Sequence, residues 1–131
     1  MPFHADDPVT LQFQDGHRWI VRAPIDWDDP DHNWTVTVPA GFVTDLASVP
    51  RGLWPLMPPS GRYAPAAIVH DYLYQHQRVG DVVISRGYAD SVLRRASGDL
   101  GVPWRIRWPM YLGVRSFGWA IWRHYRGQDA A

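Results

Sequence analysis

The sequence predicts an α+β fold in which a small antiparallel sheet from the N-terminal half packs against two or three helices from the C-terminal half. Apolar and polar residues alternate in three stretches between residues 9 and 38, as in half-buried strands. Between residues 63 and 126, apolar residues recur instead at helical spacing. A chain of 131 residues has the length of one domain with one hydrophobic core, so we expect a single domain over 1–131. Within it we expect mainly strands and loops in 1–50 and mainly helices in 63–126.

Three strands are predicted in the N-terminal half. The alternation predicts strands at 9–14 and 18–23, and the Asp-Gly dipeptide between them is a strong hairpin signal. Residues 24–33 are rich in aspartate and bracketed by prolines, so we expect a loop there. The alternation resumes at 34–38, which is the third predicted strand.

The C-terminal half predicts helices. Proline suits the first turn of a helix, so Pro65 indicates the start of a helix that runs to about residue 77. Ser85 is the predicted N-cap of a second helix that ends near residue 97. A third helical segment spans 104–125, and we expect Pro109 to interrupt or kink it and two later glycines to loosen it.

Charge is divided unevenly along the chain. All thirteen cationic residues are arginines and all thirteen acidic residues are aspartates, so the net charge is zero. Residues 1–60 carry three arginines and eight aspartates, a net charge of −5, and residues 61–131 carry ten arginines and five aspartates, a net charge of +5. The halves either neutralise each other inside the fold or let the molecule dock on a charged surface. Nucleic acid is not expected as a partner, because the arginines do not form one short run.

The chain contains no cysteine, which excludes disulfides, thiolate metal sites and cysteine nucleophiles. No N-terminal apolar stretch resembles a signal peptide, and no apolar run approaches the roughly 20 residues of a membrane span. We therefore expect a protein made in the cytoplasm and then built into a larger particle.

The most informative polar feature is the His70-Asp71 dipeptide, which lies within the apolar run 66–74. Ionisable side chains are costly to bury unless they are paired, bound to a metal or open to a cleft. On a helix, His70 and Asp71 point about 100° apart. Asp90 on the second helix is the better partner for His70, either as the carboxylate that orients a general base or as half of a structural pair.

Asp71 then needs a partner of its own. One alternative is a Ca²⁺ or Mg²⁺ ion, with carbonyl groups or Asp45 completing the ligand set. The other is an arginine, such as Arg62 or Arg86. Asp45 either binds that metal, with Ser48 as a hydrogen-bonding support, or joins Ser48 in satisfying the backbone of a tight turn.

The C-terminal segment mixes tryptophan, tyrosine and arginine, the residue types that are favoured in protein–protein contacts. The alternatives are a core helix with a cationic outer face, or a helix that lies on a membrane surface, which we favour least. If the segment binds a partner protein, the candidate interface residues are Trp108, Arg115, Trp119, Trp122 and Arg123.

Several separated motifs occur in order along the chain: residues 39–51 (PAGFVTDLASVPR), 61–63 (GRY), 66–74 (AAIVHDYLY), 85–90 (SRGYAD) and 110–118 (MYLGVRSFG). Together they resemble the domain-of-unknown-function family number 1353, which is common in bacteriophage and prophage genomes. The resemblance implies a phage-encoded or prophage-encoded protein, and it implies no particular reaction. It leads us to expect a virion-associated accessory protein of the tail region, with other phage structural proteins as its partners.

A shorter stretch is similar to the helix pair of secreted phospholipases. It comprises His70, Asp71 and Tyr74 on one helix and Asp90 on the next. The similarity implies that His70 is a general base, that Asp71 holds Ca²⁺ and that Asp90 orients His70. The alternative function is therefore a small Ca²⁺-assisted hydrolase of lipid or cell-envelope material. The expected supporting residues of this site are Tyr74, Ser48 and Arg51.

Overall fold

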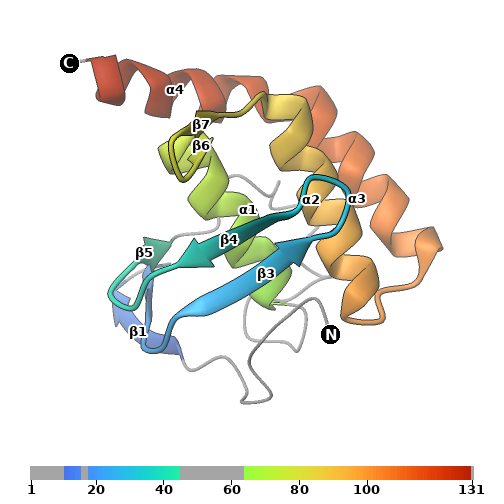
Figure 1. Ribbon diagram of the computed structural model, residues 1–131, viewed down its shortest axis with the longest axis horizontal. Helices are drawn as coiled ribbons and strands as arrows, with labels where there is room; N and C mark the ends of the chain where they lie inside the picture. The colour runs from blue at the N-terminus through green and yellow to red at the C-terminus, as the bar shows by residue number, and fades with distance from the viewer. Residues whose placement is uncertain (1–10, 16–17, 45–63, 131) are drawn as a thin grey trace.

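The computed structural model describes residues 11–15, 18–44 and 64–130. Within them the N-terminal half forms strands and the C-terminal half forms four helices, which confirms the predicted α+β fold (Figure 1). The strands lie in three small antiparallel sheets rather than the one sheet that we expected. The expected turns around Ser48 and Arg51 lie outside the described residues.

The first sheet contains the predicted hairpin. Strand β1 (Leu11–Asp15) pairs with β2 (Arg18–Val21), which pairs in turn with the short strand β5 (Val43–Thr44). The second sheet is a hairpin of two strands, β3 (Ile25–Asp29) and β4 (Trp34–Val38). Strand β4 confirms the prediction made for residues 34–38.

Strand β3 shows that the loop predicted for residues 24–33 was wrong over 25–29, whereas residues 30–33 form the turn between β3 and β4. Inside the stretch between the two prolines, apolar residues alternate with aspartates, and this alternation is a strand pattern. Trp27 is buried beneath the hairpin, while Asp26 on the other face accepts a hydrogen bond of 2.6 Å from Thr37 of β4. Cross-strand bonds of this kind let aspartate, normally a poor strand former, occupy the outer face.

Helix α1 (Ala64–His76) begins at the predicted position. A two-stranded hairpin that we did not predict follows it, formed by β6 (Arg78–Val79) and β7 (Val82–Val83). Helix α2 (Arg86–Asp99) then begins at Ser85, whose hydroxyl accepts a hydrogen bond from a backbone N–H in the first turn, as predicted for an N-cap.

The third predicted helical segment forms two helices, α3 (Trp104–Phe117) and α4 (Trp119–Ala130), which meet at Gly118. Helix α3 continues through Pro109, so the expected interruption does not occur there. Proline removes one backbone hydrogen bond and its ring crowds the carbonyl four residues earlier, and the packing of α3 along α2 offsets this cost. Helix α3 ends and α4 begins at Gly118, which is one of the two glycines expected to loosen this segment.

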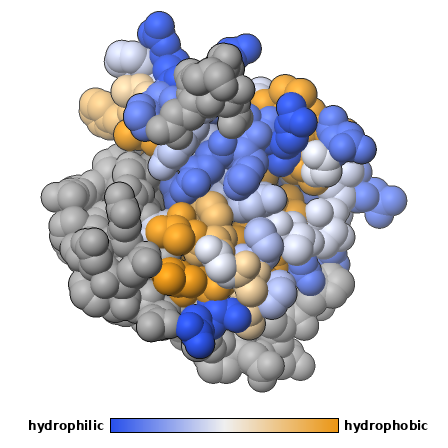
Figure 2. Space-filling model, turned by 90° about the vertical axis from the view of Figure 1, so that its left-hand side faces the viewer, coloured by the Kyte–Doolittle hydropathy of each residue, from blue (hydrophilic) through white to orange (hydrophobic). Residues whose placement is uncertain are grey.

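Helix α1 lies at the centre of the molecule. It contacts α2, α4 and strands β3, β4 and β5, while α3 packs on the far side of α2 (Figure 1). The largest fully buried side chains include Trp27, Ile68, Leu73, Tyr74, Leu93 and Met110. The side of the molecule that carries β5 shows hydrophobic and hydrophilic side chains side by side (Figure 2). Among the helices that the structure describes, none has the length and apolar character needed to cross a membrane.

Candidate functional site

The structure brings His70 and Asp90 together as the helical spacing predicted. The His70 Nε2 atom on α1 lies 2.9 Å from Asp90 Oδ1 on α2, and neither side chain is exposed to solvent. One turn further along α1, the Tyr74 hydroxyl donates a hydrogen bond of 2.6 Å to the same carboxylate oxygen. An ionised carboxylate only accepts hydrogen bonds, so the Nε2 atom of His70 carries a proton. Asp90 thus sets the tautomer and orientation of the imidazole.

Two arginines contact the second oxygen of Asp90. The Nη1 atom of Arg115 on α3 lies 3.1 Å from Oδ2, and Nη1 of Arg86 lies 3.3 Å from it. Arg86 also donates to the backbone carbonyls of Val114 and Arg115, at 3.0 and 3.1 Å. The carboxylate therefore joins three helices. We call these side chains the Asp90 cluster: His70, Tyr74, Arg86, Asp90 and Arg115.

The surroundings of the Asp90 cluster determine its protonation. Burial by itself would raise the pKa of Asp90, but hydrogen bonds and charge from His70, with hydrogen bonds from Tyr74 and Arg115, outweigh it and lower that pKa. Burial raises the pKa of Tyr74, and the negative charge of Asp90 raises it further. Near neutral pH, Asp90 is therefore an anion that receives a hydrogen bond from a protonated tyrosine.

Asp71 has different partners from His70, which agrees with their separation around the helix. Its Oδ2 atom accepts hydrogen bonds from the Thr44 hydroxyl at 2.5 Å and from the Gln75 amide at 3.1 Å. Asp71 is fully buried. Of the two arginines considered as its partner, Arg86 binds Asp90 instead, and Arg62 lies outside the described residues.

A metal site at Asp71 would require further oxygen ligands. Within the part of the chain that the structure describes, no group of three or more acidic or histidine side chains is placed to hold a metal ion. The candidate ligand Asp45 and the supporting residues Ser48 and Arg51 lie outside that part. In the described structure the hydroxyl of Thr44 is an oxygen group in direct contact with Asp71.

Sequence reasoning missed a third buried carboxylate, Asp29. Arg95 on α2 binds both of its oxygens, at 2.7 and 3.0 Å, and the Tyr88 hydroxyl donates to it at 2.8 Å. Burial alone would raise the pKa of Asp29, but the hydrogen bonds from Arg95 and Tyr88 outweigh it and hold that pKa well below its usual value. The missed signal was the alternation of β3, which turns Asp29 inward like Ile25 and Trp27.

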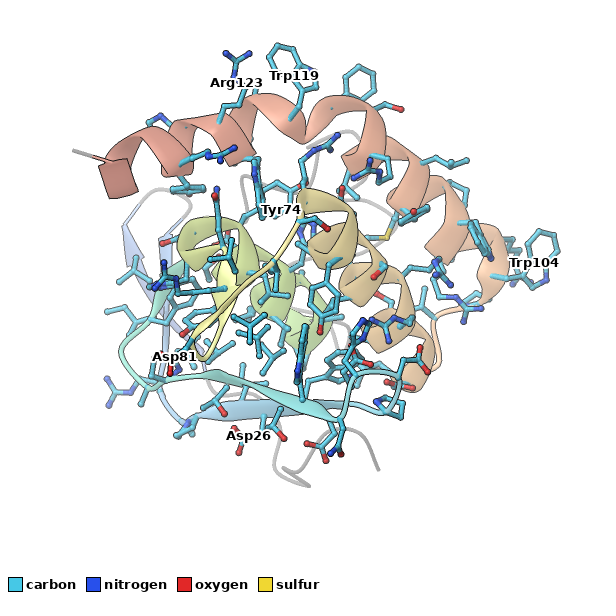
Figure 3. All side chains as sticks on the ribbon, turned by 45° about the horizontal axis from the view of Figure 1, so that its top comes forward. Asp26, Tyr74, Asp81, Trp104, Trp119 and Arg123 are labelled. Atoms are coloured by element: carbon cyan, nitrogen blue, oxygen red, sulfur yellow. The ribbon has the colours of Figure 1, made fainter. Side chains whose placement is uncertain are left out.

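The candidate interface residues fall into two groups. Trp108 and Trp119 are 42% and 52% exposed, and Arg123 is also exposed. Figure 3 shows Trp119 and Arg123 pointing away from α4, whereas Tyr74 points into the molecule. The structure instead places Trp122 in the core against the ring of Tyr74, with 5.2 Å between the ring centroids.

Arg115 is the second candidate that lies elsewhere, since its guanidinium group turns inward to Asp90. Other exposed side chains on α3 were not singled out from the sequence, although Trp104 and Leu112 lie four residues before and after Trp108 and Phe117 is in the last turn. These are Trp104, Leu112 and Phe117, which are 69%, 58% and 71% exposed.

The fold and these clusters define a small α+β domain in which helices α1, α2 and α3 are joined through one buried carboxylate. The chain belongs to the family described as Protein of unknown function (DUF1353), whose model matches residues 19–114. This confirms the predicted family, and the matched region includes His70, Tyr74, Arg86 and Asp90. No curated protein and no solved structure matches the chain.

Proposed function

We propose that this protein is a structural accessory protein of a bacteriophage or prophage particle, in its tail region, and that it docks on another virion protein through the outer side of α3 and α4. One observation carries the proposal: five large apolar side chains on these two helices are between 42% and 71% exposed. We call this surface the α3–α4 face: Trp104, Trp108, Leu112, Phe117 and Trp119.

The composition of the α3–α4 face suits a protein contact. Large apolar side chains left exposed close together mark interaction sites, and five of them on two consecutive helices favour a contact here. Trp104, Trp108 and Leu112 follow one another at intervals of four residues, so they lie along one side of α3. Residues 104–126 contain five arginines and no aspartate, and three of these arginines, Arg105, Arg123 and Arg126, are exposed. Tryptophan and arginine dominate binding hot spots, and the charge favours a partner with an acidic rim.

The buried polar groups support a framework role. His70, Asp71 and Asp90 are fully buried, so a substrate in solution does not reach them in this conformation. Arg86 ties the last turn of α3 to α2 through the carbonyls of Val114 and Arg115. The Asp90 cluster thereby holds in place the helix that carries most of the α3–α4 face. The phage setting is part of the proposal, and the resemblance of the sequence to a family common in phage and prophage genomes supports it.

Incorporation into particles tests this proposal. In a lysogen that encodes the protein, we expect the wild type in purified particles, and we expect Phe117→Ser with Trp119→Ser to reduce its amount about tenfold, as loss of a hot spot would. Quantitative mass spectrometry of particles against whole lysate measures the ratio.

The matched control is Val83→Ser, which removes an apolar side chain that is 72% exposed on β7 and is not part of the α3–α4 face. It should leave incorporation unchanged. Absence of the wild-type protein from particles, or equal incorporation of the double variant, would overturn the proposal.

A Ca²⁺-assisted hydrolase is the second candidate, and one geometric observation favours it. Asp90 holds the protonated Nε2 of His70 at 2.9 Å, as a general base requires, and Asp71 is the next residue on the helix. Catalysis would require the buried site to open.

Calorimetric titration separates the two candidates. If the protein is a hydrolase of this type, wild type binds Ca²⁺ at millimolar concentration or below and Asp71→Asn, which keeps the shape but loses the charge, binds at least about tenfold more weakly. The structural role predicts no binding to either protein. Asp81→Asn, at the exposed turn between β6 and β7, controls for loss of one carboxylate.

A further inference from the structure

A cleft of about 360 Å³ lies where the second half of α2, the start of α3 and the turn between β3 and β4 meet. Figure 1 shows this turn reaching toward α2 and α3. Its charged walls are Asp31, Arg94, Arg95, Asp99 and Arg107. We propose that the cleft binds a small anion through an oxyanion group, either a phosphate or a carboxylate. This proposal does not depend on docking through the α3–α4 face.

Both acids in the cleft are already engaged by its walls. Arg95 pairs with Asp31 at 3.1 Å, in addition to its contacts with the buried Asp29. Asp99 accepts a hydrogen bond of 2.9 Å from the indole of Trp27. Among the residues that the structure describes, no carboxylate lies within 4.0 Å of Arg94 or Arg107. Two guanidinium groups of this cleft are therefore left without a counter-ion from the described chain.

Arg94 is held in place by aromatic rings rather than by an acid. Its guanidinium carbon lies 4.6 Å from the ring centroid of Trp108 and 5.3 Å from that of Tyr111. Its Nε atom is buried and has no hydrogen-bond acceptor in the described structure. A buried donor without an acceptor costs free energy, more so in a charged group. Stacking fixes the plane of the guanidinium fork, so a bound oxyanion would meet a preorganised donor.

Arg107 depends on a glycine for its position. A Cβ atom on Gly98 would lie 2.8 Å from Nη1 and 3.3 Å from Cζ of Arg107, so a side chain there would displace the guanidinium group. Arg107 donates one hydrogen bond of 3.1 Å to the carbonyl of Val102, and no described residue accepts from its other N–H groups. The absence of a side chain at Gly98 thus allows a second guanidinium group to line the cleft beside Arg94.

The chemistry of these groups defines the ligand class. Planar guanidinium forks match the paired oxygens of phosphate and carboxylate groups, and hydrogen bonds between charged partners are the strongest available. The three arginines and two aspartates that line the cleft sum to +1, and Asp29, bound to Arg95, offsets that charge, so the donors of Arg94 and Arg107 are what favour an anion. Its volume is at the lower end of the range for small-molecule sites. The ligand that fits is a small metabolite-sized anion rather than a polymer.

Side-chain NMR of the intact protein tests the site directly. We would titrate ¹⁵N-labelled protein with inorganic phosphate and, separately, with acetate at matched ionic strength, and follow the arginine Nε–Hε signals. We expect saturable shifts at Arg94 and Arg107 with one of these anions below about 10 mM. The anion that binds more tightly identifies the group.

Three variants make the test specific. Arg94→Lys keeps the charge but loses the fork, and should weaken binding about tenfold. Gly98→Ala keeps every charge but displaces the guanidinium group of Arg107, and should also weaken anion binding about tenfold. Arg123→Lys on α4 should bind like wild type. No saturable shift with either anion, or equal weakening by Arg123→Lys, would overturn the proposal, and the dispersion of the amide spectrum shows that each variant is folded.

Discussion

Asp90→Asn is expected to lower the free energy of unfolding by about 3 kcal/mol, because it removes the charge on which three helices converge. The amide can still accept from His70 or Tyr74, but its NH₂ group would face the donors of Arg86 and Arg115. This value of about 3 kcal/mol is at the lower end of the free-energy cost of breaking a buried ion pair. Both arginines are partly exposed, so water can solvate their charges when the carboxylate is lost. Urea denaturation at pH 7 measures the loss.

The loss should also depend on pH in one direction. The pKa of Asp90 is lowered by folding, so its stabilisation is fully present above the unfolded-state pKa, near 4, and disappears as pH falls through the lower folded-state pKa. The difference between wild type and Asp90→Asn should therefore shrink as the pH falls below about 4. The pKa of Asp29 is also lowered by folding, so both proteins lose stability in acid through this residue. That loss is the same in the two proteins and cancels when their unfolding free energies are subtracted.

Asp81→Asn is the matched control, because Asp81 is exposed at the turn between β6 and β7. It should change the unfolding free energy by less than about 0.5 kcal/mol. A loss for Asp90→Asn no larger than this control, or a loss that does not change with pH, would contradict the role assigned to the Asp90 cluster.

Gly118→Ala is expected to cost about 2–3 kcal/mol, because the junction of α3 and α4 has no room for a side chain. A Cβ atom there would collide with the Tyr74 hydroxyl and would lie 2.5 Å from the carbonyl oxygen of Val114. The backbone of Gly118 is ordinary, with φ near −73°, so the cost comes from crowding and not from a left-handed conformation. Tyr74 would have to move away from Asp90.

A double-mutant cycle with Tyr74→Phe tests that explanation. Phenylalanine lacks the colliding hydroxyl, so Gly118→Ala should cost at least about 1 kcal/mol less in the Tyr74→Phe background than in wild type. Gly87→Ala is the control, since a Cβ there would meet Arg115 at 3.5 Å, an ordinary contact. Additive effects of the two substitutions would mean that Tyr74 is not what crowds Gly118.

Both predictions concern the position of α3 and therefore the α3–α4 face. Asp90 holds α3 to the two central helices, and Gly118 lets α4 turn back over Tyr74. If the α3–α4 face is the docking surface, variants that loosen α3 should also reduce incorporation into particles, although none of them removes a side chain from that face.

Much of this protein was predictable from local patterns. Helices α1 and α2 followed from helical spacing, Pro65 and the Ser85 cap, because each of these signals acts within a few residues. The partnership of His70 with Asp90 was predictable for the same reason. A short connection makes two helices neighbours, and helical spacing then decides which side chains face each other.

Strand β3 was not predicted, because its composition indicates a loop whereas its alternation of buried and partly exposed residues indicates a strand. Aspartates and flanking prolines indicate a loop, and only pairing with β4 lets Asp26 take a cross-strand hydrogen bond from Thr37 while Trp27 becomes buried. The pairing partner decided the conformation, as is usual for strands.

The sequence by itself determined the family, the α+β class, the two central helices and the buried His70–Asp90 pair. The tertiary structure alone decided that Arg115 and Trp122 turn inward, that Asp29 meets Arg95 across 66 residues, and that Arg94 lines a cleft. The physical reason is that spacing along a helix sets the direction of a side chain relative to its own axis only. Whether that direction meets a carboxylate, the core or water depends on which segment packs there, and distant parts of the chain supply that segment.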